Sequence, residues 1–380
     1  MQQKNIKLKD NSKVKTFKLV WQPARQGKIF IGSKETNSYI VVDSYWRHFT
    51  KLINKNFPLN EIAKKLSMSN TKAKLMVIAL IQNKLVHKID KNIILKRNRK
   101  APRDYIANMN PIFISLFTFL AIFALIILVL VPKFFPKPSD FFWSNYLSLS
   151  LLSSFIFTWI SAIGHELAHL TIAKLYGING KLALSHRLNF LVIETQFSDI
   201  YAIPKKGRIA IYVSGIAVDM AATTILYLIL FLNNSAVVKQ FILLEWLSIS
   251  WQFFFYMKTD VYFVIREIFG IENLYTYAKQ NLFNISKSKK INQQLTNKES
   301  MLVNIYTFFF AAGTTLGILR YTFYTIPILL TLILESLQKI IAGIYLKNSI
   351  YVFDGGVVLA VEVILNLLLI YSIIKNGYYS

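Results

Sequence analysis

Cysteine is absent from the 380-residue chain. Disulfide bonds, thiolate metal sites and cysteine nucleophiles are therefore excluded, and any metal ligand must be a His, Asp or Glu side chain. Such side chains are scarce, with 19 Asp and Glu against 44 Lys and Arg, and five histidines. The histidines are His48, His87, His165, His169 and His186. A metal site in this chain therefore has few side chains from which it can be built.

Charged residues are also few, at 17%, while 54% of the residues are hydrophobic and the mean hydropathy is +0.41. This balance excludes an ordinary soluble domain. Apolar runs of about 20 residues, the length needed to cross a bilayer, recur along the chain. We therefore expect a mainly α, polytopic bundle of about seven transmembrane helices. The expected spans are 111–131, 146–176, 209–232, 237–257, 302–319, 323–342 and 356–374.

Positive charge is concentrated before the first expected span. Residues 1–110 contain 24 basic and 6 acidic residues. The cluster that directly precedes the span is Lys96, Arg97, Arg99, Lys100 and Arg103. By the positive-inside rule this cluster places the N-terminus in the cytoplasm, and it can also contact anionic lipid head groups. We expect a multi-pass protein of the cell membrane with a cytoplasmic N-terminus, whose partners include the lipid bilayer.

Polarity divides the chain into five predicted segments. They are a soluble cytoplasmic domain, a basic juxtamembrane linker, a membrane core, a cytoplasmic loop and C-terminal spans, at residues 1–100, 101–110, 111–260, 261–300 and 301–380. In the first segment, β-branched runs predict strands at 15–20, 28–31, 38–42 and, as a wing, within 85–95. One helix is expected to start after Asp43 as its N-cap. Two further helices are expected at 58–66 and 71–83. This order predicts an α+β winged-helix-like domain.

Three stretches of this domain, residues 38–43, 60–66 and 80–86, resemble the small peptide-recognition domain of peptide-modifying systems, which has the fold of the pyrroloquinoline quinone chaperone. The resemblance implies that the domain binds a leader peptide as an added strand on a sheet edge. A purely structural domain and a DNA-binding winged helix have the same pattern. Lys72 and Lys74 are the only charges on the helix that would read DNA, so no nucleic-acid partner is expected.

The most specific chemistry lies in Gly164-His165-Glu166-Leu167-Ala168-His169. Two histidines four residues apart on a helix lie about 40° apart around its axis, so both side chains point the same way. Such a pair can bind one zinc ion, and the glutamate between them can act on an attacking water. Residues 151–163 contain no charged side chain, which places the motif in a transmembrane helix. Ionisable groups there indicate function more than a chance match.

A catalytic zinc site needs a third protein ligand and an open position for water. Asp260 is the best candidate, because it ends the fourth expected span on the cytoplasmic side of the membrane. The charge distribution places the two histidines in the same half of the membrane. Asp219 lies roughly 16 Å into the third span, which is deeper but within reach, and Glu245 lies roughly 22 Å nearer the outer face. His186 belongs to a stretch, 181–203, that we expect to form a hairpin at the membrane edge. The residues alone leave this choice open, with Glu245 disfavoured.

Two further segments accompany the histidine motif. Residues 258–262, Lys-Thr-Asp-Val-Tyr, match a Lys-x-Asp-Gly-Tyr pattern except at the valine, and residues 214–219, Ser-Gly-Ile-Ala-Val-Asp, are similar to an Ala-Gly-Pro-x-x-Asn element. Together the segments resemble the site-2 protease family of intramembrane zinc metalloproteases, most of all its peptide zinc metalloprotease branch. The resemblance implies Zn²⁺ as cofactor. The site residues that it implies are the metal ligands His165, His169 and Asp260, the catalytic Glu166 and, beside substrate or a metal ligand, Asp219.

The expected activity is that of a zinc metalloendopeptidase that cuts a peptide bond at or within the membrane. The resemblance implies a membrane-associated or leader-bearing peptide substrate, such as the precursor of a modified peptide or of a bacteriocin. The alternative is a membrane-embedded regulator, or a peptide export or immunity protein, whose metal site does not act in proteolysis. Such a protein has no need for Glu166. A protease built on paired glutamates is disfavoured because the sequence has no Glu-Glu pair.

Overall fold

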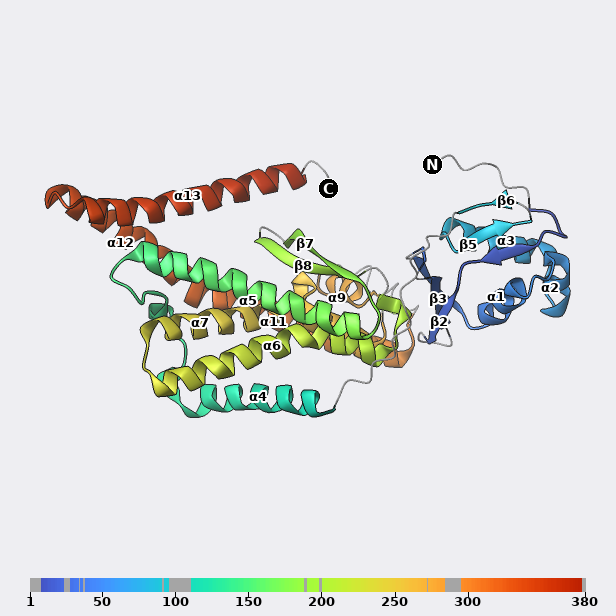
Figure 1. Cartoon of the computed structure of the whole chain (residues 1–380), viewed down its shortest axis with the longest axis horizontal. Helices are drawn as coiled ribbons and strands as arrows, with labels where there is room; N and C mark the ends of the chain where they lie inside the picture. Colours follow the sequence, from blue (N-terminus) through green and yellow to red (C-terminus); the bar gives the residue numbers. More distant parts are fainter. Residues whose placement is uncertain are drawn as a thin grey trace. The chain divides into compact units, whose positions relative to one another are not determined.

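The computed structural model is mainly α-helical, with small β-sheets in the N-terminal part (Figure 1). It describes residues 8–23, 28–33, 35–36, 38–90, 92–95, 111–187, 190–197, 200–271, 273–283 and 295–377. The chain forms two compact units. One comprises residues 1–107, 173–181 and 196–208, and the other comprises residues 108–172, 182–195 and 209–380. The basic cluster at 96–103 and the predicted linker at 101–110 lie outside the described residues.

The first unit contains two antiparallel sheets and three helices. The sheet β1-β5-β6 consists of β1 (Val14–Thr16), β5 (Val86–Ile89) and β6 (Asn92–Ile93). The sheet β2-β3-β4 consists of β2 (Val20–Pro23), β3 (Lys28–Ser33) and β4 (Ser38–Asp43). The helices are α1 (Trp46–Asn54), α2 (Leu59–Lys65) and α3 (Asn70–Gln82). The predicted succession of strands, three helices and a terminal pair of strands is therefore present.

Apolar side chains from all these elements except β6 meet in one core. Ile31, Phe49, Ile62, Val77 and Leu80 are among its fully buried members, and they come from β3 and each of the three helices. The helical spacing of the buried residues in α3 is what the sequence pattern requires for such burial, whereas β3 is buried on both faces over its last four residues. The core explains why these elements fold as one unit.

Two local predictions for this unit are wrong. Asp43 is the last residue of β4, and α1 begins after Tyr45 without a side-chain cap. The strand expected at 15–20 is divided between two sheets, because β1 ends at Thr16 after a register shift and β2 starts only at Val20. Ser69 is the N-cap of α3, and its hydroxyl accepts a hydrogen bond from the Lys72 amide. Caps and bulges depend on tertiary pairing, which local patterns do not reveal.

The segment at 200–202 packs on the β2-β3-β4 sheet within the first unit. The Tyr201 ring stacks on Phe30 with a centroid distance of 5.0 Å, and Gln22 donates a hydrogen bond to the Ala202 carbonyl at 3.3 Å. Arg208 is buried beside both rings, and its guanidinium donates to the Ile203 carbonyl at 2.9 Å. The short helix η3 (Ile200–Ala202) is thereby attached to the N-terminal sheet.

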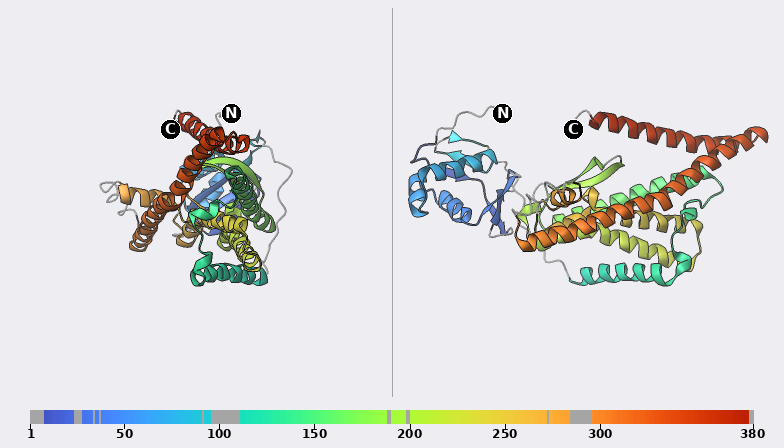
Figure 2. Two further views of the ribbon diagram at one scale, coloured as in Figure 1. Left: turned by 90° about the vertical axis from the view of Figure 1, so that its left-hand side faces the viewer. Right: turned by 180° about the vertical axis from the view of Figure 1, so that it is seen from behind.

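The chain after residue 110 is dominated by long helices. They are α4 (Pro111–Leu130), α5 (Leu147–Leu175), α6 (Lys205–Leu232), α7 (Ala236–Trp251), α8 (Asp260–Phe269), α9 (Leu274–Phe283), α11 (Asn297–Arg320), α12 (Ile326–Tyr345) and α13 (Ser349–Gly377). Short turns of helix are η1 (Pro132–Phe134), η2 (Pro138–Phe141), η4 (Phe255–Met257) and the π-turn η5 (Tyr321–Thr325). In Figures 1 and 2, α4 to α7 run side by side. Ala124, Met220 and Ile249 pack together between α4, α6 and α7.

The prediction of seven membrane spans is wrong. Among the described residues, three helical runs are long and apolar enough to cross a membrane: Leu147–Leu175, Lys205–Leu232 and Asn297–Tyr345. The part of α4 whose side chains are described covers only Thr118–Leu130, and α7 stops at Trp251 after 16 residues. The fifth and sixth expected spans are one continuous rod, seen in Figure 2, because η5 continues the helix past Arg320. No Gly or Pro stands between residues 318 and 326 to break it.

A buried acid joins the start of α5 to the last two helices. Asp354 on α13 accepts hydrogen bonds from the backbone amides of Leu147 (3.0 Å) and Ser148 (2.9 Å). Lys339 on α12 places its ammonium group 2.7 Å from the same carboxylate. A carboxylate at a helix N-terminus satisfies amides that have no partner within the helix and complements the helix dipole. This contact fixes the end of α5 that is far from the histidine motif.

Candidate metal centre

The α5 helix brings His165 and His169 together on one of its faces. Their ring centroids lie 4.8 Å apart, with the ring planes at 82°, and both side chains are buried. A ligand atom of each, together with a carboxylate oxygen of Glu166, lies within 4.8 Å of the other two. Imidazole nitrogens and a carboxylate at this spacing can hold a metal ion. The predicted i, i+4 placement of the two histidines is therefore confirmed.

Asp260 reaches the histidines from a different element. It is the first residue of α8, and its Oδ2 atom lies 2.9 Å from Nε2 of His165 and 3.2 Å from Nε2 of His169. Burial by itself raises the pKa of this carboxyl, but the contacts with the two imidazoles outweigh that effect and lower the pKa below its usual range. The carboxylate is therefore anionic and faces both rings. Val261, where the family pattern has Gly, is the second residue of α8, a position that suits valine.

The loop between α7 and α8 places Asp260 at this point. Lys258 adopts a left-handed backbone conformation (φ 53°), which turns the chain before Thr259. The Thr259 hydroxyl donates to the Gln252 carbonyl, and the Gln252 side-chain oxygen accepts from the Asp260 amide at 3.2 Å. Gln252, at the end of α7, thus ties the start of the loop to its end at Thr259 and Asp260. Nothing in the sequence pattern had marked Gln252, because its role depends on where the chain turns.

The outer nitrogens of both imidazoles have partners of their own. Nδ1 of His169 donates to the Ile211 carbonyl at 2.6 Å, and Nδ1 of His165 lies 2.7 Å from Oδ2 of Asp219. When Nδ1 carries the proton, Nε2 of a neutral imidazole is the atom with the free lone pair. In that tautomer both lone pairs face the Asp260 carboxylate, and the three acceptor atoms can bind a cation in place of the Nε2 protons that otherwise bridge to Asp260. This donor set fits a cation, and the outer hydrogen bonds are of the kind that orients metal-binding histidines.

Gly215 on α6 allows the close approach of the His165 ring. A Cβ atom at this position would lie 2.4 Å from Nε2 of His165, which real contacts do not permit. The neighbouring Ser214 hydroxyl lies 3.2 Å from Nδ1 of His169. The Ser-Gly pair that the sequence placed early in the third span is therefore part of the wall of the site. Only glycine leaves room for the ring at 215.

Glu166 lies half-buried beside the histidines, and a β-hairpin adjoins it. The strands β7 (Gly180–Arg187) and β8 (Phe190–Phe197) form a two-stranded sheet, so the predicted hairpin is confirmed. The Thr195 hydroxyl on β8 donates to the Glu166 carbonyl at 3.2 Å. His186 lies on β7, but its side chain lies outside the described residues. The hairpin therefore reaches the backbone of the residue that the motif marks as the catalytic base.

Glu245 on α7 is closer to the motif than the sequence indicated. Its Oε1 atom accepts a hydrogen bond from the Ser161 hydroxyl at 2.8 Å. Ser161 lies one helical turn before His165 on α5. Its other carboxylate oxygen is buried and has no hydrogen-bond partner in the described part of the chain. The separation expected from helical rise was wrong because α7 ends at Trp251 and the next eight residues do not continue the helix. Of the acids weighed as third ligand, Asp260 alone contacts both histidines within the described structure.

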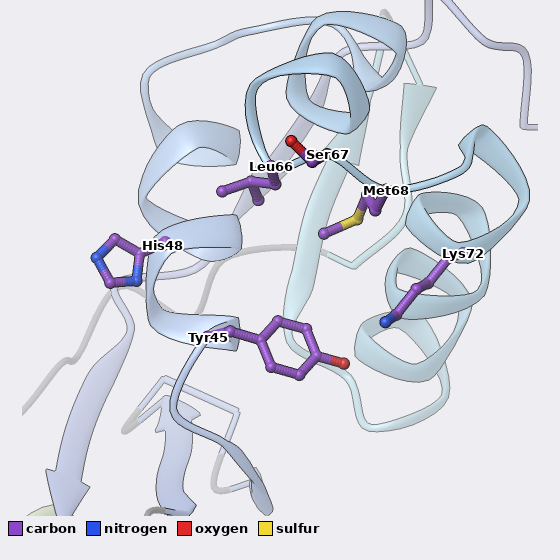
Figure 3. A pocket seen from close by; sticks show the side chains of 6 residues that line it. All are labelled: Tyr45, His48, Leu66, Ser67, Met68 and Lys72. Carbon is purple, nitrogen blue, oxygen red and sulfur yellow. The ribbon is translucent and has the colours of Figure 1, made fainter.

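A separate pocket of about 250 Å³ opens on the first unit (Figure 3). Figure 3 shows the Tyr45 ring and the Lys72 side chain pointing toward each other, and the ammonium group lies 5.2 Å from the ring centroid. The lining side chains are Tyr45, His48, Leu66, Ser67, Met68 and Lys72. They come from the start of α1, the turn between α2 and α3, and the first turn of α3. No sequence pattern pointed to this pocket.

The comparisons with known proteins add no relative. No protein-family model, no curated protein and no solved structure matches this chain. The resemblance to site-2 proteases therefore rests on the motif residues and their geometry. Within the described residues, the chain has a buried His-Glu-x-x-His group that can hold a metal ion, together with three helices that can cross a membrane.

Proposed function

We propose that the chain is a membrane-embedded zinc metalloprotease that hydrolyses a peptide bond at or within the membrane. The observation that supports this most is the convergence of Nε2 of His165 and Nε2 of His169 on one carboxylate oxygen of Asp260. Two imidazoles and a carboxylate are three protein ligands of the types that catalytic zinc takes, with one position left open. The absence of cysteine removes the competing thiolate sites.

In this proposal Glu166 is the general base. A zinc ion in the site would lower the pKa of a water molecule and polarise the scissile carbonyl. Glu166 follows His165 directly on α5, and its carboxylate lies within reach of the metal-binding atoms. It can accept the proton of the attacking water and pass it to the leaving amine. A metal site that served structure alone would have no use for a carboxylate in this place.

Asp219 and the Ile211 carbonyl are positioning groups. They accept from the outer nitrogens of His165 and His169 and so select the tautomer that presents Nε2 to the metal. Asp219 is nearly completely buried, so its position is fixed by the surrounding helices. The rings then need little reorganisation when a metal binds. This preorganisation is what distinguishes a metal site from a chance pair of histidines.

We infer that the substrate is a small precursor peptide that is membrane-associated or carries a leader. The two-stranded β7-β8 sheet offers unpaired edges, and an extended peptide could add to one of them beside Glu166. The N-terminal unit supplies a second three-stranded sheet with outer strands β2 and β4. That unit is the part we assign to leader recruitment. If deletion of residues 182–195 left cleavage unchanged, the assignment of β8 to substrate binding would fall.

The test compares the wild-type chain with Glu166→Gln and His165→Ala in membranes. Zinc content and cleavage of a precursor peptide encoded beside this gene are measured together. We expect one zinc per chain in wild type and in Glu166→Gln, none in His165→Ala, and cleavage by wild type alone. Equal cleavage by wild type and Glu166→Gln would overturn the mechanism. Zinc bound by a wild type that cuts no candidate peptide would favour a regulator or an export or immunity protein.

A further inference from the structure

Arg320, the last residue of α11, is a cation with no acidic partner among the described residues. It lies within the long apolar run Asn297–Tyr345, where a charged side chain is costly and indicates function. Its Nη1 atom is buried and has no hydrogen-bond acceptor in the described structure. Other arginines behave differently: Arg266 lies 3.1 Å from the Glu267 carboxylate, and Arg208 donates to the Ile203 carbonyl. The guanidinium of Arg320 thus retains donors that nothing described in the protein uses.

Two aromatic rings hold this guanidinium in place. Its central carbon lies 5.6 Å from the Trp251 ring centroid and 5.3 Å from the Phe254 ring centroid. Cation–π contacts of this kind favour the positive charge over the ring faces. They do not satisfy the five N–H donors, which lie in the plane of the guanidinium and point outward. The rings therefore orient the fork and leave its donors for a planar anion.

The loop that touches Arg320 is the loop that carries Asp260. Residues 253–256 dock closely on α11 because Gly313 and Gly317 have no side chain. A Cβ atom at Gly313 would lie 2.4 Å from the Phe253 carbonyl oxygen. Trp251 and Phe254 contact Arg320, while the adjacent Gln252 binds the Asp260 amide. An anion at Arg320 would therefore bind against the segment that positions the third candidate metal ligand.

The backbone beside Arg320 is also unusual. The π-turn η5 begins at the next residue, Tyr321, and ends at Thr325. Turns of this type inside long helices are rare and recur at functional sites. A π-turn is retained only where some interaction offsets its cost. It gives a second, independent reason to assign a function to this stretch of α11.

We propose that Arg320 binds a carboxylate of the peptide substrate, either an acidic side chain or the C-terminal carboxylate. This inference rests on the proposed protease function. A guanidinium fork matches a carboxylate with two parallel hydrogen bonds. A lipid phosphate is the competing occupant, but lipid head groups are recognised by clusters of basic residues at the membrane surface. Arg320 is instead a lone charge with one buried nitrogen. It contacts the rings of Trp251 and Phe254, which precede the candidate metal ligand Asp260 in the chain.

Direct binding of a small carboxylate tests the site without any proteolysis. The probe is sodium benzoate, with neutral benzamide as its matched control, added to the full chain in phosphatidylcholine nanodiscs. The readouts are the unfolding temperature and tryptophan fluorescence. We expect benzoate, but not benzamide, to raise the unfolding temperature of wild type and of Glu166→Gln by about 2 °C or more. Arg320→Gln should lose this response.

Two further variants guard against misfolding and unspecific charge effects. Arg320→Lys keeps the charge but lacks the fork, so it should show a weaker benzoate response. Arg47→Gln removes an exposed arginine from α1 and should respond as wild type does. An equal benzoate response in Arg320→Gln and Arg47→Gln would overturn the proposal. A second set of nanodiscs contains phosphatidylglycerol. An Arg320-dependent stabilisation by this lipid, with no response to benzoate, would also overturn the proposal, because a lipid would then be the occupant.

Cleavage separates this proposal from the one on which it rests. With a cleaved precursor in hand, each Asp and Glu of the peptide is replaced by Asn or Gln, and its C-terminal carboxylate is replaced by the amide. One replacement should lower kcat/KM at least tenfold for wild type and have no further effect in Arg320→Gln. Cleavage with no such residue would overturn the substrate subsite and leave the protease standing. An Arg320-dependent benzoate response in a chain that cuts no peptide would overturn the protease and keep the carboxylate site.

Discussion

Aspartates contact α5 at both of its ends, and the two sets of contacts differ in their balance of hydrogen-bond donors and acceptors. At the start of the helix, Asp354 receives two backbone N–H groups and the Lys339 ammonium group. Near its end, Asp219 and Asp260 meet His165 and His169. At the first end every acceptor has a donor. At the second end three atoms that can all act as acceptors, Nε2 of the two imidazoles and Oδ2 of Asp260, face one another, and either Nε2 protons or a bound cation can complete the set.

This difference separates a structural contact from a chemical one. Asp354 at the first end and His165, His169 and Asp219 at the second are all buried, so burial does not distinguish the two groups. A carboxylate whose acceptor atoms are all hydrogen-bonded contributes only to the stability of the folded state. An unsaturated set of acceptors costs free energy until a ligand binds, and proteins retain such costs mainly at functional sites. Variants at the two ends should therefore affect different measurements.

The largest effect on stability is expected at the structural end. Asp354→Ala leaves the Lys339 ammonium group and two helix N–H groups without their acceptor, and loss of one partner of a buried pair costs about 3–5 kcal/mol. The free energy of unfolding should fall by that amount in a denaturant titration, with zinc content unchanged. Glu335→Gln, an exposed acid on the same helix as Lys339, should change stability little. Loss of zinc from Asp354→Ala at an unchanged stability would reverse the comparison.

Zinc itself should stabilise the other end. A ligand that binds only the folded state adds about 2.7 kcal/mol of stability at a free concentration one hundred times its Kd. Chelation should remove this increment from wild type and from Glu166→Gln, since neither lacks a ligand. His165→Ala should be insensitive to zinc and chelator alike. Equal stabilisation of His165→Ala and wild type would show that the ion binds elsewhere.

A smaller effect is expected from the outer partner of His165. Asp219→Ala removes the acceptor of Nδ1, and loss of such a partner lowers metal affinity about 10–100-fold. Asp219→Asn keeps an acceptor oxygen and should retain more of the affinity. Competition with a chelator of known affinity measures the zinc Kd of both. If the metal-free Asp219→Ala chain lost as much stability as Asp354→Ala while its zinc affinity stayed unchanged, Asp219 would be a structural residue only.

The local part of the site could be predicted from the sequence because it depends on helical geometry alone. His165 and His169 share a face wherever the stretch is helical, and the hairpin after α5 follows from its strand-like spacing. Asp260 was found by its level in the membrane. That argument placed Glu245 too far away, because no local signal showed that the helix would end at Trp251 and the chain would turn through Lys258.

The parts that could not be predicted depend on contacts between distant residues. Asp354 and Leu147 are about two hundred positions apart, and nothing near either residue indicates the other. The run from Asn297 to Tyr345 contains Arg320, which normally separates two spans, and the π-turn that carries the helix onward has no sequence signature. Span counting by composition failed there because residues 320–322 were taken as a break between the expected spans 302–319 and 323–342.

The smallest effect should come from the hydroxyl that ties the hairpin to the site. Thr195→Val removes the hydrogen bond to the Glu166 carbonyl, which is worth about 1 kcal/mol and hence less than tenfold in rate. Thr171→Val is the matched control, because the Thr171 hydroxyl also donates to a carbonyl of α5, that of Leu167. If β8 holds substrate beside Glu166, Thr195→Val should lower kcat/KM for a cleaved peptide and leave zinc affinity alone, while Thr171→Val changes neither. A zinc Kd altered by Thr195→Val but not by Thr171→Val would instead assign β8 to the support of the metal ligands.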